Sequence, residues 1–551
     1  FFKQKTAYEI KECDWSSDVC SSDLVWRTVA EAQPEAVALE SGDVVVTWES
    51  FVHHMDSLGS YFHSLDLPRQ STVAAYLYNC PEYLITFAGT LAAGHVPINT
   101  NYRYGHDELA YLFDNADTRV LVFHGAFTDK IDALRGELPD IVAYLHVDDG
   151  TTPCPPWATP FREALATPPT TLPPSSPDDL VMLYTGGTTG MPKGVMWRQD
   201  DLFVRLNSGG FRKYPEEGGL EDVRRCIDEA GAGYTLLPAC PLMHGTGLFT
   251  AIRALGEAGR VVLLPSRHFD PVELATTLQD FDVNVAVIVG DPFARPLLHE
   301  LRANPARYPL ASLVSIVSSG AMWSQEIKDG LIDHVPHVLL VDTFGSTEAL
   351  GLGSSLSSKK RTSATATFSL GPLVRVVDDK NQLLPPGTEG RLQCRGPFMF
   401  VGYIKQETLT RENFDGDWFD TGDLATLDAE GFIRITGRLK DIIIRGGENI
   451  PVKYVEDILY EDPRVQDAAI VAMPDPRLGE RACAFVICRE GKLLDMPGMQ
   501  TFLAERGVAK VYWPERLEIA QELPRTANGK IRKADLRARI AREAGARKHS
   551  A

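Results

Sequence analysis

Apolar strand-like runs and helix-like periodic segments alternate over the first two thirds of the chain. Short apolar runs predict buried strands at 73–77, 120–123, 180–184, 261–264, 283–289, 314–317 and 338–341, and helical spacing predicts helices at 51–65, 83–93, 109–116 and 271–279. Such alternation is typical of α/β folds with parallel sheets. The Pro-dense stretch 153–177 and the polar, Gly-rich stretch 209–233 predict a surface connection and a surface insertion.

The pattern changes from about Leu370 onward. Short runs at 391–395 and 431–435 predict antiparallel strands of a small β-subdomain. After a charged joint at 437–441, the pattern predicts helices at 451–460 and 533–540 and strands at 468–473 and 482–488. The predicted fold class is α/β: a large N-terminal α/β domain with parallel sheets and a small β-subdomain, then a small, mobile α+β C-terminal domain.

The composition narrows the classes of partner and compartment. The formal net charge of −19 argues against a nucleic-acid partner, because neutralising phosphates needs a basic surface. No apolar run is long enough to span a bilayer, and no secretory signal pattern occurs. The nine cysteines include no C-x-x-C pair, which favours reduced thiols in the cytoplasm over a zinc site or a disulfide framework. Peripheral membrane association and a homodimer both stay open.

Residues 1–24 differ in character from the rest. They show no clear periodicity and resemble translated sequencing-adapter sequence, so we set them aside as a non-native segment. The alternative is a genuine, flexible N-terminus. Under either interpretation we expect no functional role for Cys13 and Cys20.

The strongest candidate for chemistry is the loop that follows the apolar run 180–184. It combines flexible glycines, hydroxyl donors and one cation: Gly186, Gly187, Gly190, Gly194, Thr185, Thr188, Thr189 and Lys193. Glycine lets the backbone approach a ligand closely, and Pro192 keeps the loop from winding into a helix. These features indicate an anion site, and phosphate is the usual anion. Alone, the loop is equally compatible with an ordinary turn, and it has neither Walker A nor dinucleotide-fingerprint spacing.

This loop resembles the phosphate loop of the acyl-adenylate-forming, or AMP-binding, enzymes, which include acyl-CoA synthetases, luciferases and adenylation domains. Their common pattern is Thr-Ser-Gly-Thr-Thr-Gly-x-Pro-Lys-Gly, and Gly186 stands here where Ser is commoner. Further segments match the family in the same order, at 237–247, 319–321, 344–348, 418–424, 438–450 and 524–530. Together these motifs make the resemblance specific over roughly residues 25–542.

The resemblance implies the residues that contact ATP and CoA. The turn at 319–321 lies against adenine, Phe344 stacks on adenine where Tyr is commoner, and Thr347 donates to the α-phosphate. Asp423 accepts the ribose hydroxyls with help from Arg438, and the stretch around Gly446 lines the pantetheine channel. The implied contacts are Thr185, Gly186, Gly187, Thr188, Thr189, Gly190, Lys193, Ser319, Gly320, Ala321, Asp342, Phe344, Gly345, Ser346, Thr347, Asp423, Arg438, Lys440, Arg445, Gly446, Gly447 and Lys530. Taken alone, the turn at 319–321 is better explained as an ordinary tight turn. The alternative for Asp423 is a turn residue beside Gly422, and Arg438 at the family's position argues against it.

The resemblance also implies the catalytic residues Lys530, Glu348, Thr185 and His244. Mg²⁺ prefers few protein carboxylates together with phosphate oxygens, so Glu348 with the Thr185 hydroxyl is the expected metal site. Lys530 bridges the carboxylate and the α-phosphate as charge shifts in the transition state, and His244 borders the acyl pocket. The plain alternatives are a helix N-terminal carboxylate for Glu348, a structural histidine and a solvated lysine.

The same resemblance divides the chain. Residues 25–437 correspond to the AMP-binding N-terminal domain, 438–441 to a hinge with Lys440 as its pivot, and 442–551 to a C-terminal lid domain. Both Gly447 and Lys530 then belong to the lid, so we expect it to take more than one position.

The implied function is an ATP-dependent acyl-CoA ligase. A carboxylic acid reacts with ATP to give acyl-AMP and pyrophosphate, and a thiol then takes the acyl group. Free CoA is the expected thiol because no carrier-protein segment follows Lys530, and the stretch 241–247 lacks an Asp for an amino acid's ammonium. Residues 191–199 resemble actinobacterial synthetases for fatty acids or steroid side-chain acids, so we expect a medium- or long-chain, or bulky, apolar acid. The alternatives are a non-catalytic nucleotide-binding protein, against which the intact motifs argue, and a luciferase-like oxygenase, which the sequence does not support.

Overall fold

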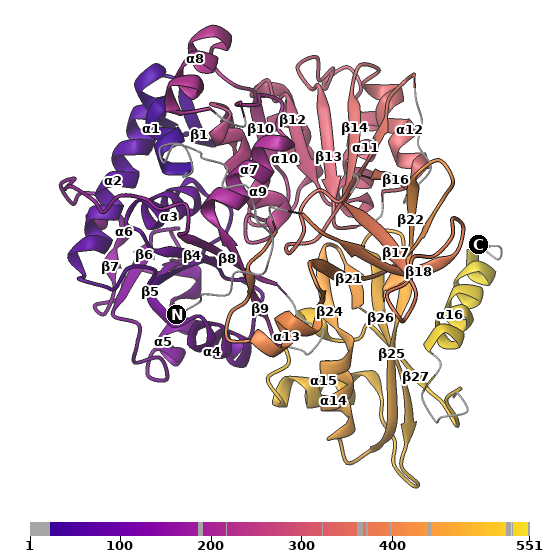
Figure 1. Cartoon of the computed structure of the whole chain (residues 1–551). Coiled ribbons are helices and arrows are strands. Elements are labelled where there is room, and N and C mark those ends of the chain that lie inside the picture. Colours follow the sequence, from indigo (N-terminus) through magenta and orange to yellow (C-terminus); the bar gives the residue numbers. More distant parts are fainter. Residues whose placement is uncertain are drawn as a thin grey trace.

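The chain folds into a large N-terminal part and a smaller C-terminal part that packs against it (Figure 1). In this computed structural model, structure is described for residues 22–185, 191–215, 218–321, 323–360, 367–370, 373–396, 399–438, 442–524, 531 and 533–548. Three sheets organise these residues, two in the N-terminal part and one in the C-terminal part.

The first N-terminal sheet has eight strands in the order β19-β9-β8-β4-β3-β5-β6-β7. The strands from β8 to β7 along this order are parallel, and β9 and β19 extend the sheet with antiparallel pairs. Its strands are β3 (Thr72–Tyr76), β4 (Val96–Asn99), β5 (Thr118–His124), β6 (Ala143–Val147), β7 (Thr159–Pro160), β8 (Leu180–Thr185), β9 (Lys193–Arg198) and β19 (Gly402–Tyr403).

The second sheet has 14 strands and changes character at β14. The strands β1, β11, β10, β12, β13 and β14 are parallel, whereas β15 and the strands beyond it pair antiparallel around the small core of Phe368, Leu392 and Ile433. Its strands are β1 (Val37–Ser41), β2 (Val44–Thr47), β10 (Thr235–Pro238), β11 (Arg260–Val262), β12 (Val285–Ile288), β13 (Ser315–Ser319), β14 (Leu339–Phe344), β15 (Gly353–Ser357), β16 (Thr367–Leu370), β17 (Val374–Val377), β18 (Glu389–Cys394), β20 (Phe414–Asp415), β21 (Trp418–Leu427) and β22 (Phe432–Arg438).

Helices cover both sheets because their strands are apolar on both faces. In β5, for example, Val120 and Val122 belong to the core between the two sheets, while Leu121 and Phe123 belong to the core on the opposite face. The inner layer contains α1 (Ser22–Ala32), α2 (Trp48–Ser64), α3 (Pro81–Ala92), α7 (Gln199–Ser208), α8 (Leu220–Ala230) and α9 (Gly245–Gly256). The outer helices are α4 (His106–Asn115) and α5 (Thr128–Leu134) on the first sheet and α10 (Pro271–Asp280), α11 (Asp291–Ala303) and α12 (Gln325–His334) on the second.

The C-terminal part is an α+β unit whose sheet has two differently occupied faces. Ala468 and Ile470 belong to a core shared with the N-terminal part, whereas Ala469 and Val471 belong to a core with α16. Figure 1 shows α16 on the outer side of this sheet. The elements are β23 (Ile442–Arg445), β24 (Glu448–Pro451), α14 (Val452–Tyr460), β25 (Val465–Asp475), β26 (Gly479–Cys488), α15 (Met496–Glu505), β27 (Arg516–Ile519) and α16 (Lys533–Lys548).

The predicted fold class is confirmed, and three local expectations differ from the structure. The predicted insertion 209–233 contains α8, whose apolar Val223 and Ile227 are fully buried and which packs on α1. The predicted connection 153–177 contains β7 and the short helix α6 (Phe161–Ala164), anchored by buried Phe161. Helix α1 begins at Ser22, inside the segment that we set aside, and its Asp23 accepts a 2.8 Å hydrogen bond from Ser175.

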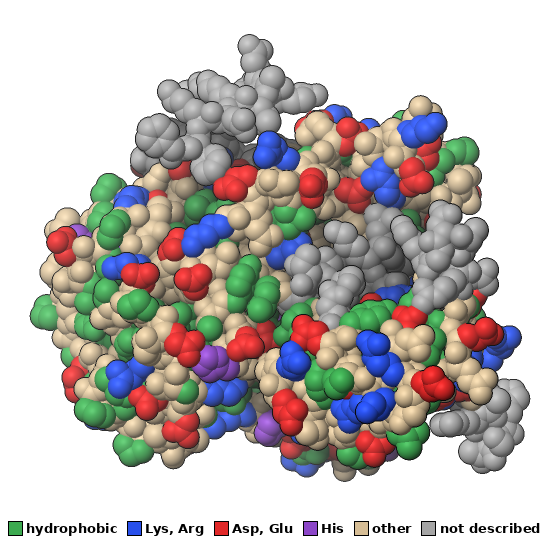
Figure 2. All heavy atoms as spheres, turned by 90° about the horizontal axis from the view of Figure 1, so that it is seen from below, with side chains coloured by type: hydrophobic (Ala, Val, Ile, Leu, Met, Phe, Trp, Pro, Cys, Tyr) green, Lys and Arg blue, Asp and Glu red, His purple; other side chains and the backbone are tan. Residues whose placement is uncertain are grey.

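The surface of the described residues is mixed in charge. Figure 2 shows acidic and basic side chains interspersed over the face that it presents. None of the helices in the described ranges combines the length and apolar character needed to cross a membrane.

Candidate active site

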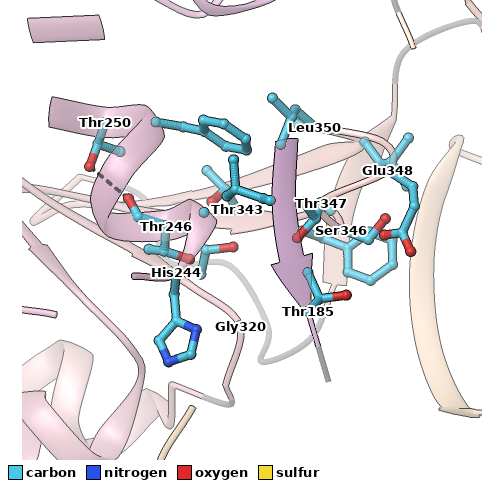
Figure 3. Close-up of a pocket in the computed structure, with 18 of the residues that line it drawn as sticks. Thr185, His244, Thr246, Thr250, Gly320, Thr343, Ser346, Thr347, Glu348 and Leu350 are labelled. Carbon is cyan, nitrogen blue, oxygen red and sulfur yellow. Dashed lines mark hydrogen bonds between the residues drawn. The ribbon is translucent and has the colours of Figure 1, made fainter. Parts of the chain in front are cut away.

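One large cavity lies at the carboxyl ends of the parallel strands, where α/β sheets commonly bind ligands. Its volume is about 1170 Å³, and its walls come from both N-terminal sheets, from α9 and from the C-terminal part. The structure brings eleven of the predicted site residues to this cavity: Thr185, Lys193, His244, Ser319, Gly320, Phe344, Gly345, Ser346, Thr347, Glu348 and Gly447. In Figure 3, His244, Thr246 and Thr250 lie on one side, and Thr185, Ser346, Thr347 and Glu348 lie on the other.

Several predicted residues that the structure describes do not line the cavity. Ala321, Asp342, Asp423, Arg445 and Gly446 are absent from its lining, although Asp423 directly follows three lining residues, Asp420 to Gly422. The Arg445 guanidinium instead bonds Glu515 and the Val511 carbonyl within the C-terminal part. Arg438 ends β22 opposite Asp423 of β21. Residues 186–190, Lys440 and Lys530 lie outside the described residues.

The side chain of Asp342 lies on the wrong face of β14 for a nucleotide contact. Successive residues of a strand point to opposite faces, and Val341 and Thr343 line the cavity. Asp342 is buried and pairs at 2.9 Å with the ammonium of buried Lys328. Burial raises the pKa of Asp342, against the opposing effect of Lys328. The side chain of Asp342 therefore forms an ion pair that anchors β14, and its expected cofactor contact stays a prediction.

Glu348 sits at a corner of the cavity with a hydroxyl and a cation nearby. The Tyr403 hydroxyl donates to Glu348 Oε1 at 2.8 Å, and the Lys193 ammonium lies 5.1 Å from the centre of the Tyr403 ring. Burial and the neighbouring Glu348 charge raise the pKa of Tyr403, so its proton stays in place to orient the carboxylate. The preceding carbonyl, that of Thr347, accepts a 2.8 Å bond from Trp197 Nε1, which fixes the backbone here.

The turn after β13 and the ring of Phe344 form another wall. Gly320 has φ of +87°, a conformation that side chains rarely adopt, which explains the glycine. Phe344 lies 5.6 Å from Phe368, ring centre to ring centre, and also lines the cavity. A flat ring beside an exposed backbone turn is suited to stacking against a planar base.

Sequence reasoning placed Glu448 in the stretch expected to line the pantetheine channel but gave it no role of its own, and the structure shows that it joins the C-terminal part to the cavity. Its Oε1 lies 3.2 Å from His244 Nε2, and its Oε2 accepts from the Asn101 amide at 3.2 Å. Arg103 Nη1 lies 3.4 Å from Oε1. Burial alone would raise the pKa of Glu448, but His244, Arg103 and Asn101 stabilise the carboxylate more strongly and hold its pKa at about 2. In the sequence, the position of Glu448 directly after two glycines was the signal that could have pointed to it.

The two glycines before Glu448 let this loop approach the N-terminal part closely. Gly446 and Gly447 have φ of +57° and +87°. A Cβ at Gly447 would lie 3.1 Å from Val289 Cγ1, a tight contact, and the positive φ would strain any other residue there. The turn thus closes one side of the cavity, where Ile444 and Tyr512 also form part of the lining.

Comparison with known proteins identifies the family. A family model described as "AMP-binding enzyme" matches residues 26–404, and one described as "AMP-binding enzyme C-terminal domain" matches residues 454–530. The chain belongs to the AMP-binding enzyme family. Relatives extend over almost its whole length. The "Medium-chain acyl-CoA ligase Mig" of Mycobacterium avium is 31% identical, over 92% of this chain and 96% of that protein.

Two further comparisons are with a second relative of this AMP-binding enzyme and with a solved structure. The "Medium/long-chain-fatty-acid--CoA/3-oxocholest-4-en-26-oate--CoA ligase" of Mycolicibacterium smegmatis is 32% identical, over 91% of this chain and 93% of that protein. Among solved structures, amide bond synthetase McbA from Marinactinospora thermotolerans has a TM-score of 0.78 at 24% identity, covering 93% of this chain and 99% of that one. At 24% identity, the match to the amide bond synthetase concerns the fold alone.

The donor set at Glu348 fits a magnesium ion shared with a nucleotide. No cluster of three or more His, Cys, Asp or Glu side chains suited to a metal occurs within the described part of this AMP-binding enzyme. A protein-held zinc site would need such a cluster. Mg²⁺ instead accepts one or two carboxylates with phosphate oxygens, and the Glu348 carboxylate and the Thr185 hydroxyl line the same cavity.

Proposed function

We propose that this AMP-binding enzyme is an ATP-dependent acyl-CoA ligase acting on an apolar carboxylic acid. The observation that carries the proposal is that one cavity collects the groups that both half-reactions need. Glu348 and Lys193 supply a carboxylate and a cation for phosphate, and the loop at Gly447 supplies a narrow wall beside His244. The acyl-CoA ligases among its relatives support the same reaction.

In the first half-reaction, an oxygen of the acid attacks the α-phosphorus of ATP, and the bond to pyrophosphate breaks. Lys193 and the Thr185 hydroxyl line the cavity beside Glu348, where they can balance the developing charge on the phosphate oxygens. Bound Mg²⁺ would add charge neutralisation at these oxygens. We assign Lys530 to the bridge between the carboxylate and the α-phosphate, on the strength of the family resemblance.

In the second half-reaction, the CoA sulfur attacks the acyl carbon of acyl-AMP and AMP leaves. Glu448 bonds His244 and so attaches the loop 446–448 to the N-terminal part. The turn at Gly447 in this loop narrows the approach to the cavity. The docked loop is therefore the arrangement that we assign to thioester formation. The reaction then needs only the acid, ATP and CoA as partners, and we place it in the cytoplasm.

A panel of carboxylic acids tests the proposed function. Each acid is incubated with MgATP, with and without CoA, and AMP release is measured. We expect CoA-dependent release with medium- to long-chain or bulky apolar acids, because one wall of the cavity is apolar. Its side chains are Leu206, Phe249, Val317, Val341 and Leu350. Activity confined to acetate or amino acids would contradict the substrate class, and no release with any acid would contradict the ligase.

The Glu448 contacts predict a selective defect. Glu448→Gln removes the charge that faces His244 and Arg103, while the shape of the side chain is kept. We expect thioester formation from supplied acyl-AMP to fall roughly 10-fold, the range for a lost bond to a charged group, with pyrophosphate release nearly unchanged. Glu461→Gln, on the exposed side of the same domain, is the matched control. Equal losses in both half-reactions would rule out the selective role.

A further inference from the structure

Tyr403 connects two parts of the candidate site that belong to different sheets. It ends β19, which pairs with β9 of the first sheet, so that Tyr403 lies opposite Val195. Lys193 is the first residue of β9, whereas Glu348 follows β14 of the second sheet. Lys193, Glu348 and Tyr403 all line the large cavity. One tyrosine therefore lies between the cation and the carboxylate that we assign to the nucleotide.

The hydroxyl of Tyr403 holds one oxygen of the carboxylate. It donates to Glu348 Oε1 at 2.8 Å, and Oε2 accepts no hydrogen bond from the residues that the structure describes. Because a carboxylate can accept at both oxygens, this arrangement leaves Oε2 for a cation in the cavity. A carboxylate that binds a metal is commonly held by such a second hydrogen bond, whose loss lowers metal affinity about 10- to 100-fold.

The ring of Tyr403 faces the cation. The Lys193 ammonium lies 5.1 Å from the ring centre, within the range of a cation–π attraction. The ring itself is fixed: Tyr403 is 6% exposed, its backbone N–H donates to Thr410 Oγ1 at 3.0 Å, and the Phe400 ring lies 5.2 Å away, centre to centre. A fixed ring restricts the positions that the ammonium can take.

We propose that Tyr403 is a positioning residue for the nucleotide: its hydroxyl orients Glu348 toward Mg²⁺, and its ring positions Lys193 toward phosphate. This inference rests on the proposed acyl-CoA ligase activity, in which MgATP is a substrate. The two roles use different parts of one side chain, so substitutions can separate them. Loss of the hydroxyl weakens the metal-linked part of ATP binding, whereas loss of the ring also weakens the binding of ATP without metal.

The test measures nucleotide binding without turnover. Calorimetry gives the Kd of ATP with Mg²⁺ and with EDTA, in the absence of acid and CoA. For Tyr403→Phe we expect MgATP to bind about 10- to 100-fold more weakly, and metal-free ATP to bind as in the wild type. For Tyr403→Met we expect metal-free ATP also to bind about 3- to 10-fold more weakly. The rise in Tm that MgATP produces should rank the variants in the same order.

Two controls separate positioning from general damage to the fold. Tyr214 is 5% exposed, and its hydroxyl donates to the Gly256 carbonyl at 2.7 Å, outside the lining of the large cavity. Tyr214→Phe should leave both Kd values unchanged. In a Glu348→Gln background, Tyr403→Phe should cause no further loss of MgATP affinity, because its effect acts through the carboxylate.

Four results would overturn the inference. Unchanged MgATP binding in Tyr403→Phe, or losses that are additive with Glu348→Gln, would reject the role of the hydroxyl. Equal losses with and without Mg²⁺ in Tyr403→Phe would mark a structural role. Unchanged metal-free binding in Tyr403→Met would reject the role of the ring. A protein that binds MgATP in the expected pattern and yet releases no AMP with any acid would contradict the proposed function alone.

Discussion

Replacing Glu348 by glutamine is expected to lower pyrophosphate release by about 100- to 1,000-fold, the range for removing one preorganised electrostatic contact to a transition state. The substitution keeps the shape of the side chain and its contact with the Tyr403 hydroxyl. It removes the negative charge of the carboxylate that we expect to bind Mg²⁺. Rates are measured with saturating acid over a range of Mg²⁺ concentrations, and extra Mg²⁺ should restore activity only in part.

The control for this experiment is Glu412→Gln. Glu412 is an exposed carboxylate that also lines the cavity, so its loss changes the local charge equally. We expect that variant to stay within a few-fold of the wild type. Unchanged turnover in Glu348→Gln would place the metal ligand elsewhere.

Lys530→Ala is expected to separate the two half-reactions. Lys530 lies outside the described residues, and its assigned role rests on the family resemblance. Leu523 and Ile531 pack in the core that faces α16. Gly447 and Glu448, on the same small domain, line the cavity at the opposite side of that sheet. On this basis we propose that the docked position of Gly447 serves thioester formation and that adenylation uses another position of the domain.

For Lys530→Ala we expect overall activity to fall about 100- to 1,000-fold through loss of acyl-AMP formation. Thioester formation from supplied acyl-AMP should stay near the wild-type rate. The two rates are measured separately, by pyrophosphate release and by CoA-thioester formation. Equal losses in both would contradict the assigned role.

The sequence predicted the elements that local patterns determine. The apolar run 180–184 forms β8, as predicted. The motif at 344–348 begins at the last residue of β14, and the carboxyl ends of neighbouring parallel strands meet at one edge of the sheet. The same reasoning placed Thr185, Gly320 and Phe344 around one cavity.

The sequence patterns could not predict contacts between residues that are far apart in the chain. Asp342 lies one position from the cavity-facing Thr343, and only the register of β14 shows that it pairs with Lys328. The contact between His244 and Glu448 joins residues 204 positions apart across two domains. Helix α8 was missed because its apolar residues are few, although Val223 and Ile227 suffice to bury one face.

The central claim is that one cavity makes an acyl-adenylate from the acid itself. An acid labelled with heavy oxygen in its carboxylate, incubated with MgATP and CoA, tests this directly by mass spectrometry of the products. Attack by the carboxylate on the α-phosphorus leaves one acid oxygen on AMP when the thioester forms. We predict AMP carrying a single labelled oxygen and unlabelled pyrophosphate. Labelled inorganic phosphate with ADP, or product thioester with unlabelled AMP, would contradict the account.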